Sequence, residues 1–574
     1  MNISNKTINW HRLIFIIFIS AYALLMLIKP NLAPTDDYVF LRTLQDGKPL
    51  LYYSANPPPG YDNLTKTGRL AILGDAEYNL PLLFSKSPSP FWYYLIHAFQ
   101  YVVLMIIFVK IMARFTSSKF LIYIAPVLLS LFPGMAIAFF RTHIAERNMI
   151  FYYAIFLYFY LKYLEKPKLH YLVFGIISAN LVIHIKENAF IALGAFTFFH
   201  LLLSWKKSRP LLKADAPQTQ KTEPPPLERF SLKIFDGLVI LGCLSYLLLY
   251  YFIVYRHLEP NAALYGQVPY NHLLVFIKNL LNYGLFSDPI LILLLLPFTA
   301  WRIYKALRRQ LELHPVYDSM LIAGSMFPMA YLALNMFGPS HFFPAYVFAL
   351  PPLIYFFSQR EFKGFYWKGA AVVCGVALIF NVFPTGIHYI AYYKYLSLNF
   401  NKTLDFFSQD INFRHSRQRA NIFLDAVDPN TGIASYFIFT EFFQYKGLAW
   451  QQFDFKSNVK IKDDAPYLAN DFLARQPFTI FKSNETFEIS KGDYLVITPD
   501  SDTKNITGPY IQSLGQDYDL IFKTKSPLAF PNLNLKTLAK YILAKRLTPE
   551  QKKEGLLINE NLMQWPNYYV FVKR

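Results

Sequence analysis

Long apolar runs are the feature that most restricts what this chain can fold into. A helix needs roughly 20 apolar residues, and at least about 17, to cross the hydrocarbon core of a membrane. Runs near that length recur from residue 13 to residue 389. They lie at 13–28, 91–109, 120–140, 149–161, 171–183, 189–205, 237–255, 290–301, 320–337, 342–357 and 369–389. The sequence therefore predicts a polytopic α-helical membrane protein with about 11 transmembrane helices.

Charges between the runs predict an orientation. Basic residues gather in every second connection, as at 110–119, 162–168, 206–209, 302–309 and 360–368. Cytoplasmic loops carry an excess of Lys and Arg, so these connections and the amino terminus are expected inside. This pattern supports the runs at 149–161, 171–183 and 290–301, which are short for a span. With an odd number of crossings the carboxyl terminus lies outside, and the first run is expected to stay as an anchor because no A-x-A cleavage site follows it.

Composition excludes two other classes of protein. Hydrophobic residues make up 54% of the 574 residues and charged residues only 16%, more apolar surface than one soluble core buries. The net charge of +19 is spread between apolar runs and forms no basic stripe or recognition motif, so no nucleic-acid partner is expected. Cys243 and Cys374 both lie in apolar runs and indicate neither a disulfide framework nor a Cys-based metal site.

Two regions interrupt the apolar pattern. Residues 206–233 include APQTQKTEPPPLERF, whose proline and polar content predicts a cytoplasmic linker. From residue 393 the chain turns polar, with strand-like pieces YFIFTEFF, DYLVITPD, YDLIFKT and NYYVFVKR and one helical stretch, LKTLAKYILAKR. The expected domains are a membrane region at 1–392 and a soluble α/β or α+β extracytoplasmic domain at 393–574.

A charged loop at 30–90 follows the first apolar run. It begins with the adjacent carboxylates Asp36 and Asp37, and also contains Arg69 and Glu77. A solvated turn with a capped helix start would explain the acidic pair alone. About sixty residues are far more than a connector needs, however, and alternating polar and apolar residues suggest amphipathic helices on the membrane surface. Such helices could cover a cavity that opens towards lipid.

Two further outer connections carry ionisable residues. RTHIAERNM contains Arg141, His143, Glu146 and Arg147, and HIKENAF contains Lys186 and Glu187. Interfacial anchoring would explain the first group, and a local Lys–Glu pair that caps a helix would explain the second. Positive charge on the outer side runs against the orientation rule, and ionisable groups near membrane depth often mark function. The three connections are expected to meet on one face.

This pattern resembles the GT-C superfamily of membrane glycosyltransferases, which includes protein O-mannosyltransferases, lipid A aminoarabinose transferases and mycobacterial arabinosyltransferases. The matching features are the acidic pair in the first outer loop, an acidic residue in HIAERN and the Lys–Glu step in HIKENAF. The topology and the outer carboxyl-terminal domain are also similar. The late stretch NMFGPSHFFPAYVFALPPL departs from the family, because it offers His341 where relatives often carry an Arg–Tyr step.

The resemblance implies transfer of a sugar from a polyprenyl-phosphate carrier to a glycan, lipid or protein acceptor. A carboxylate would take the proton of the acceptor hydroxyl, with Asp36 as this base and Asp37 orienting it. Developing charge on the leaving phosphate needs preorganised cations. The candidates are Arg141, Arg147 and Lys186, ahead of Arg69 and His341. His143, Glu146, Glu187 and Glu77 are expected at the acceptor side or elsewhere in the site.

The remaining expectations concern mechanism and location. Direct displacement with inversion is simpler than a route through a covalent sugar–enzyme intermediate, because no separate nucleophilic carboxylate is evident. The sequence requires no cofactor, although a divalent cation beside Asp36 is possible. The expected location is a bacterial inner membrane, with the site on the periplasmic side of the cell envelope. The alternatives are a flippase or transporter of lipid-linked saccharide and a non-catalytic envelope protein, but the sequence reveals neither broken helices nor inverted repeats.

Overall fold

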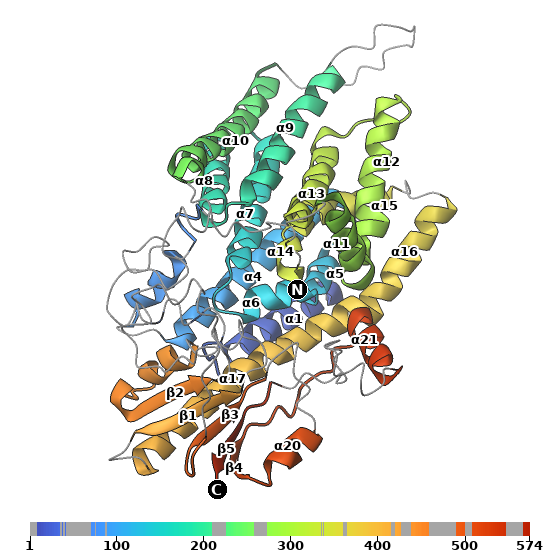
Figure 1. The fold of residues 1–574 in the computed structure, drawn as a ribbon. Coiled ribbons are helices and arrows are strands. Elements are labelled where there is room, and N and C mark those ends of the chain that lie inside the picture. Colours follow the sequence, from blue (N-terminus) through green and yellow to red (C-terminus); the bar gives the residue numbers. More distant parts are fainter. Residues whose placement is uncertain are drawn as a thin grey trace, which may run out of the picture.

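Most of the chain forms helices, and a small sheet lies at one end (Figure 1). The computed structural model describes residues 9–34, 37, 41, 70–74, 76–85, 89–208, 226–257, 272–334, 336, 338–359, 364–414, 419–425, 438–457, 489–499, 508–546 and 566–574. Asp36 and Arg69 lie outside these residues, as does most of the first loop.

The helices follow the apolar runs closely. They are α1 (Trp10–Leu27), α4 (Pro90–Phe115), α5 (Lys119–Ser130), α6 (Pro133–Phe140), α7 (Ala145–Glu165), α8 (Leu169–Ile185), α9 (Ala189–Ser208), α10 (Pro226–Ile253), α11 (His272–Phe286), α12 (Leu296–Leu307), α13 (Pro315–Ala333), α14 (Pro339–Phe342), α15 (Ala345–Ser358), α16 (Phe365–Ala377) and α17 (Phe383–Arg414). Short helical segments are η1 (Ala76–Leu83), η2 (Tyr255–His257), η3 (Leu291–Leu295) and η4 (Leu378–Val382).

Length and hydropathy indicate an integral membrane protein with fewer full-length spans than the sequence predicted. Within the described ranges, four helical stretches are long and apolar enough to cross a membrane: 10–27, 90–115, 233–257 and 365–414. The pair α5 and α6 makes a fifth if it is counted as one span. α8, α9 and α15 are apolar but shorter. The count of about 11 crossings is therefore not reached by this criterion.

The run at 120–140 is broken in the middle. α5 and α6 meet at an angle of 63° across Leu131 and Phe132, and Pro133 begins the second helix. Proline disfavours helical geometry in the residue before it, and Phe132 is extended there. α17 packs at this break, where a Cβ on Gly386 would collide with the carbonyl oxygen of Leu131. Although the sequence revealed no broken helix, the structure contains one.

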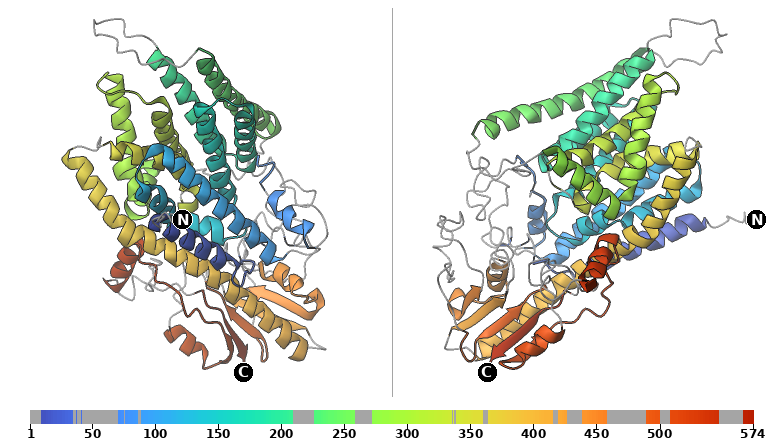
Figure 2. Two further views of the ribbon diagram at one scale, coloured as in Figure 1. Left: turned by 180° about the vertical axis from the view of Figure 1, so that it is seen from behind. Right: turned by 45° about the vertical axis from the view of Figure 1, so that its right-hand side comes forward.

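Two expected boundaries also differ. The linker predicted at 206–233 is helical at both ends, because α9 continues to Ser208 and α10 begins at Pro226. The boundary expected at residue 393 falls inside α17, which continues to Arg414 before the first strand (Figure 2). Tyrosine and polar residues lower the hydropathy of this helix without ending it, so the change in composition at residue 393 does not coincide with the end of a helix.

The carboxyl-terminal region contains a mixed sheet of five strands in the order β2-β1-β3-β5-β4. The strands are β1 (Ala420–Asp425), β2 (Phe453–Ser457), β3 (Tyr494–Ile497), β4 (Tyr518–Lys523) and β5 (Tyr569–Lys573). β1 pairs in parallel with β2 and β3, whereas β5 is antiparallel to β3 and β4. Two helices, α20 (Gly508–Leu514) and α21 (Leu535–Arg546), belong to the same region.

One strand prediction was wrong. YFIFTEFF was expected as a strand, but the residues from 438 to 445 are helical. Phe439, Phe442 and Phe443 recur at helical spacing and are buried. Phe439 and Phe442 pack edge-on against Phe400 of α17. β1 and β2 were not predicted at all, whereas β3, β4, β5 and α21 match the predicted pieces.

The sheet core is shared with the membrane region. One face of the sheet buries α17, the 438–445 helix and several residues from before the sheet in a single apolar cluster. Leu32, Leu41, Tyr78 and Tyr93 belong to it, and the first three come from the loop after α1. The opposite face carries a smaller cluster around Phe423 and Phe571. Leu32, Leu41 and Tyr78 of the first loop are therefore packed in the core that the helices and the sheet share.

Candidate functional site

Asp37 joins the first loop to the connection between α6 and α7. Its carboxylate accepts the backbone N–H of Ala33 at 2.7 Å and the backbone N–H of His143 at 3.2 Å, one on each oxygen. The side chain is fully buried, and this burial raises the pKa of Asp37 to about 6, while hydrogen bonds and the nearby Arg141 act in the opposite direction. Asp37 therefore orders two loops at one place.

Tyr78 of η1 continues this contact. Its hydroxyl donates to the backbone carbonyl of Thr142 at 3.2 Å and accepts the backbone N–H of Ile144 at 3.2 Å. Its ring lies 5.1 Å from the ring of His143, measured between centroids. The hydroxyl of Tyr93 in α4 donates to the carbonyl of Tyr78. η1, which is a 3-10 helix containing Pro81, is thus fixed against the α6–α7 turn.

Arg147, in the first turn of α7, is the most heavily bonded residue of the region. Its guanidinium pairs with Glu77 of η1, and its Nε donates to Gln100 Oε1 at 3.0 Å. Nη1 donates to the carbonyl of Thr142 at 3.1 Å and lies 3.5 Å from Nδ1 of His97. The side chain is fully buried. Its donors point at protein atoms, so Arg147 holds η1, α4 and α7 together.

Glu146 brings two more elements, the end of α8 and α14, to the same end of the bundle. Its Oε1 lies 3.2 Å from Nζ of Lys186, which follows α8, and 2.7 Å from Nδ1 of His341 in α14. The carboxylate is 3% exposed and Lys186 9%, whereas the His341 side chain is 29% exposed. The buried pair thus has a neighbour that reaches the surface of the cluster.

Arg141 and Lys394 border the cluster on the side of α17. The guanidinium of Arg141, which is half-buried, lies 5.8 Å from the ring centroid of Tyr393. Nζ of Lys394 donates to the carbonyls of Met26 at 3.3 Å and Ile28 at 2.6 Å, at the end of α1. Cations stabilise the carbonyl end of a helix, so Lys394 fixes the point where the first loop begins.

The connection between α8 and α9 also touches the first loop. The backbone N–H of Leu73 donates to the carbonyl of His184 at 2.8 Å. The hydroxyl of Tyr246 in α10 donates to the carbonyl of Leu70 at the same distance. Glu187 follows Lys186 and is half-buried. The first loop, the α6–α7 connection and the α8–α9 connection were all predicted to be outer connections. Described residues of each contact at least one of the other two.

The structure thus brings most of the sequence-predicted residues together. Two groups form: Asp37 with Arg141 and His143, and Glu146 with Lys186 and His341. Arg147 and Glu77 connect the second group to η1, whereas Asp36 and Arg69 lie outside the described residues. The sequence analysis did not predict that His97 and Gln100 contact Arg147. Two polar residues inside the apolar run at 91–109 could have indicated such a role. No sequence pattern distinguished Tyr78 or Lys394.

The opposite end of the bundle carries a different set of pairs. Arg114 at the end of α4 pairs with Glu165 at the end of α7, and Arg302 pairs with Asp318 at 2.5 Å. Both pairs lie near the basic connections that were predicted to face the cytoplasm. The two ends of the helices are therefore chemically distinct.

The described residues contain no group of three or more His, Cys, Asp or Glu side chains placed to hold a metal ion. The site contains paired carboxylates and cations, Glu77 with Arg147 and Glu146 with Lys186, beside the partly exposed imidazole of His341. Side chains of these types can transfer protons and can bind an anion. Comparison with protein-family models finds no match to this sequence, and comparison with curated proteins finds none either.

Proposed function

We propose that this chain is a membrane glycosyltransferase of the GT-C type, which moves one sugar from a polyprenyl-phosphate carrier to an acceptor outside the cytoplasm. The observation that supports this most is the meeting of the first loop, the α6–α7 turn, the α8–α9 turn and α14 at one end of the bundle. Ion pairs and hydrogen bonds link all four. Loops that only anchor helices have no need of such a network.

The acceptor hydroxyl loses its proton as its oxygen attacks the anomeric carbon. Asp36 is the proposed base. Its neighbour Asp37 has both oxygens occupied by backbone N–H groups and is fully buried, which suits a positioning role and not proton transfer.

The leaving group is a polyprenyl phosphate, whose charge rises as the bond to the sugar breaks. Arg141 and His341 are partly exposed and are the proposed direct ligands of this phosphate. Lys186 adds positive charge behind them. Arg147 is fully buried and its donors are directed to protein atoms, so we assign it the role of holding η1 in place of its predicted role as a phosphate ligand.

The arrangement in the membrane follows the charge pattern. We propose that the basic connections face the cytoplasm and that the site and the sheet region lie on the periplasmic side of a bacterial inner membrane. About 11 crossings then require α7, α12 and α13 in addition to the shorter apolar helices α8, α9 and α15. The backbone N–H and C=O groups of these helices are bonded within each helix, as a lipid environment demands.

A transfer assay tests this proposal. Membranes containing the wild-type chain or the Asp36→Asn variant receive a panel of tritiated polyprenyl-phosphate hexoses and pentoses, together with cell-envelope acceptors. The wild type is expected to transfer at least one sugar, and Asp36→Asn to lose transfer by 100-fold or more, since general base catalysis contributes about 10²–10⁴ in rate. Asp405→Asn is a matched control, because Asp405 is exposed on α17. Full transfer by Asp36→Asn would remove the base from the mechanism.

A flippase for lipid-linked saccharide is the second candidate, favoured by the broken pair α5 and α6. Transporters build their binding sites from discontinuous helices near the middle of the membrane. The residues at this break, Leu131 and Phe132, are apolar, so the break offers no ionic ligand for a phosphate. Movement of a fluorescent polyprenyl-phosphate sugar across proteoliposomes without any covalent transfer would favour this candidate.

A further inference from the structure

His341 is held in a defined orientation by its neighbours. Nδ1 lies 2.7 Å from Oε1 of Glu146, and the ring stacks on that of Tyr331 with centroids 5.4 Å apart and planes 11° apart. A carboxylate can only accept from the imidazole, so Nδ1 carries the hydrogen. This leaves Nε2 as the atom that gains and loses a proton.

Nε2 of His341 has room for a ligand. Within the part of the chain that the structure describes, no hydrogen-bond partner of Nε2 occurs, and the side chain is 29% exposed. Gly338 lies beside this edge of the ring, where a Cβ would stand 3.3 Å from Cδ2 and 3.9 Å from Nε2. The missing side chain keeps the edge of the ring open.

The side chains around the ring suit an anionic ligand. Glu146 contacts both His341 and Lys186, while Tyr331 of α13 covers one ring face. One carboxylate is thus shared by two basic side chains, so the group carries no excess of negative charge that would repel an incoming phosphate.

We propose that His341 is the general acid of the reaction, with Glu146 as its positioning residue. This inference rests on the proposed function. As the acceptor oxygen forms its bond to the anomeric carbon, the bond from that carbon to the phosphate oxygen breaks and its electron pair stays on the phosphate. Nε2 of His341 gives its proton to that phosphate, and Asp36 takes the proton of the acceptor. Water returns His341 and Asp36 to their starting states.

A lipid phosphate is the ligand class expected at His341, held by Nε2–H. Farnesyl phosphate is a probe that needs neither the sugar nor the acceptor. The effect of His341 is read as the difference in affinity between the wild type and a variant.

The experiment measures farnesyl phosphate binding in detergent by calorimetry. The wild type should bind about tenfold more tightly than His341→Gln. Glu146→Gln should also weaken binding although His341 is intact, because the carboxylate that orients the imidazole is lost, and Glu146→Asp should restore part of the affinity. His170→Gln, at the exposed start of α8, is the matched control and should behave as wild type.

A second measurement needs no variant. Diethyl pyrocarbonate modifies accessible imidazole nitrogens, and farnesyl phosphate should protect His341 but not His170, as read by mass spectrometry of the wild type. Equal modification of His341 with and without the ligand, or equal affinity of His341→Gln and the wild type, would overturn this inference. Sugar transfer by the wild type would still leave the proposed function standing. Absence of any phosphate binding would overturn both.

Discussion

At the scale of residues, Asp37 shows how a buried carboxylate couples loop structure to pH. The unfolded carboxyl titrates near 3.8 and the folded one near 6. Between these values the folded chain holds a proton that the unfolded chain has released. The contribution of Asp37 to the free energy of unfolding is therefore fully present below pH 3.8 and is lost as pH rises through 6. This contribution is about 3 kcal/mol at most.

Thermal unfolding in detergent measures this effect. The melting temperature of the wild type should fall between pH 4 and pH 6.5, and Asp37→Asn should lose this component because the amide does not titrate. Asp405→Asn, whose carboxylate is exposed, should keep the wild-type slope. If Asp37→Asn retains the full slope, Asp37 is not the group that causes it.

The pair of Arg147 and Glu77 permits a double-mutant test. Replacing Arg147 by Met leaves Glu77, Gln100 and a carbonyl without their donor, and breaking a buried pair costs about 3–5 kcal/mol. Glu77→Met removes the other partner. The double variant should be more stable than the sum of the two losses predicts, by 1 kcal/mol or more, as measured by thermal unfolding. Additive losses would mean that the two side chains do not interact.

At the scale of elements, the position of α14 depends on one glycine. A Cβ on Gly134 of α6 would collide with the carbonyl oxygen of Pro339 and with Phe343. Gly134→Ala should therefore push α14 away from α6, weaken the contact of His341 with Glu146, and cost about 1–3 kcal/mol. Gly375→Ala in α16 has open space around it and should be neutral or slightly stabilising. Unfolding temperatures compare the two, and equal values would contradict this packing.

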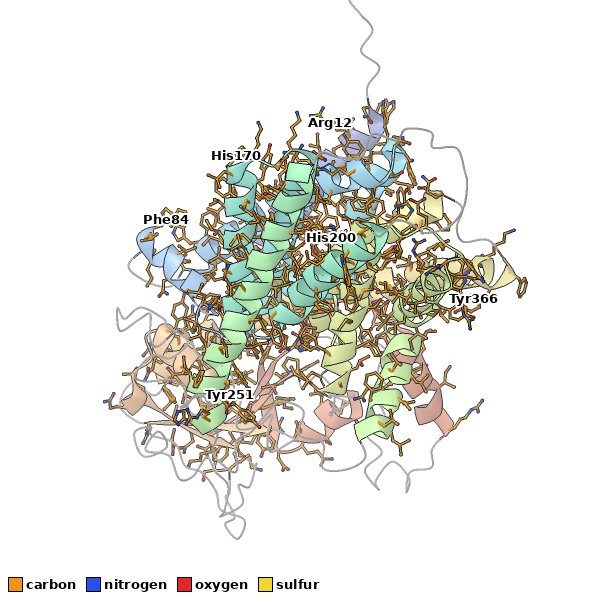
Figure 3. All side chains as sticks on the ribbon, turned by 90° about the horizontal axis from the view of Figure 1, so that it is seen from above. Arg12, Phe84, His170, His200, Tyr251 and Tyr366 are labelled. Carbon is orange, nitrogen blue, oxygen red and sulfur yellow. The ribbon has the colours of Figure 1, made fainter. Side chains whose placement is uncertain are left out.

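A buried polar group in the helices lies far from the predicted loops. Asp236 of α10 accepts from the hydroxyl of Tyr160 at 2.7 Å and lies 2.7 Å from Nδ1 of His200. All three are nearly fully buried, and Figure 3 shows His200 in the interior while His170 and Arg12 lie at the edge. Asp236→Ala should lower the melting temperature by several degrees, since it leaves two buried partners unmatched. An unchanged melting temperature would show that the group adds no stability.

The sequence predicted helices better than strands for a physical reason. Apolar runs locate membrane helices because the bilayer demands them, so most helices overlap the predicted ranges. α11 was not predicted because Lys278 and Asn279 interrupt its apolar residues. The 438–445 helix was misread since the four phenylalanines of YFIFTEFF suit a strand and a buried helix equally well. Only its contact with α17 decides between them.

At the scale of the whole molecule, charge sidedness predicted which loops meet, because loops at one end of a bundle share one surface. It placed Glu146, Lys186 and the loop after α1 at the same end. It gave no hint that α17 runs from the bundle into the sheet, or that Leu32 and Tyr78 pack in the sheet core. Such contacts depend on the packing of distant segments, which no local pattern encodes.

Because one apolar cluster contains residues of the sheet, α17 and the first loop, the sheet region helps to position the site. The amide of Asn399 on α17 donates to Ser526 at 2.9 Å and to the carbonyl of Pro566 at 2.8 Å. Replacing Asn399 by Leu should loosen the sheet from α17 and lower farnesyl phosphate affinity together with stability. Gln409→Leu, at an exposed position of the same helix, serves as the control. Unaltered affinity in a destabilised Asn399→Leu variant would show that the site does not depend on the sheet.

A cryo-electron microscopy structure with polyprenyl phosphate shows most directly where the lipid phosphate binds. Density for the phosphate is expected beside His341 and Arg141, with Asp36 facing the position of the sugar. Phosphate density at the opposite end of the bundle, near Arg114 or Arg302, would contradict this placement.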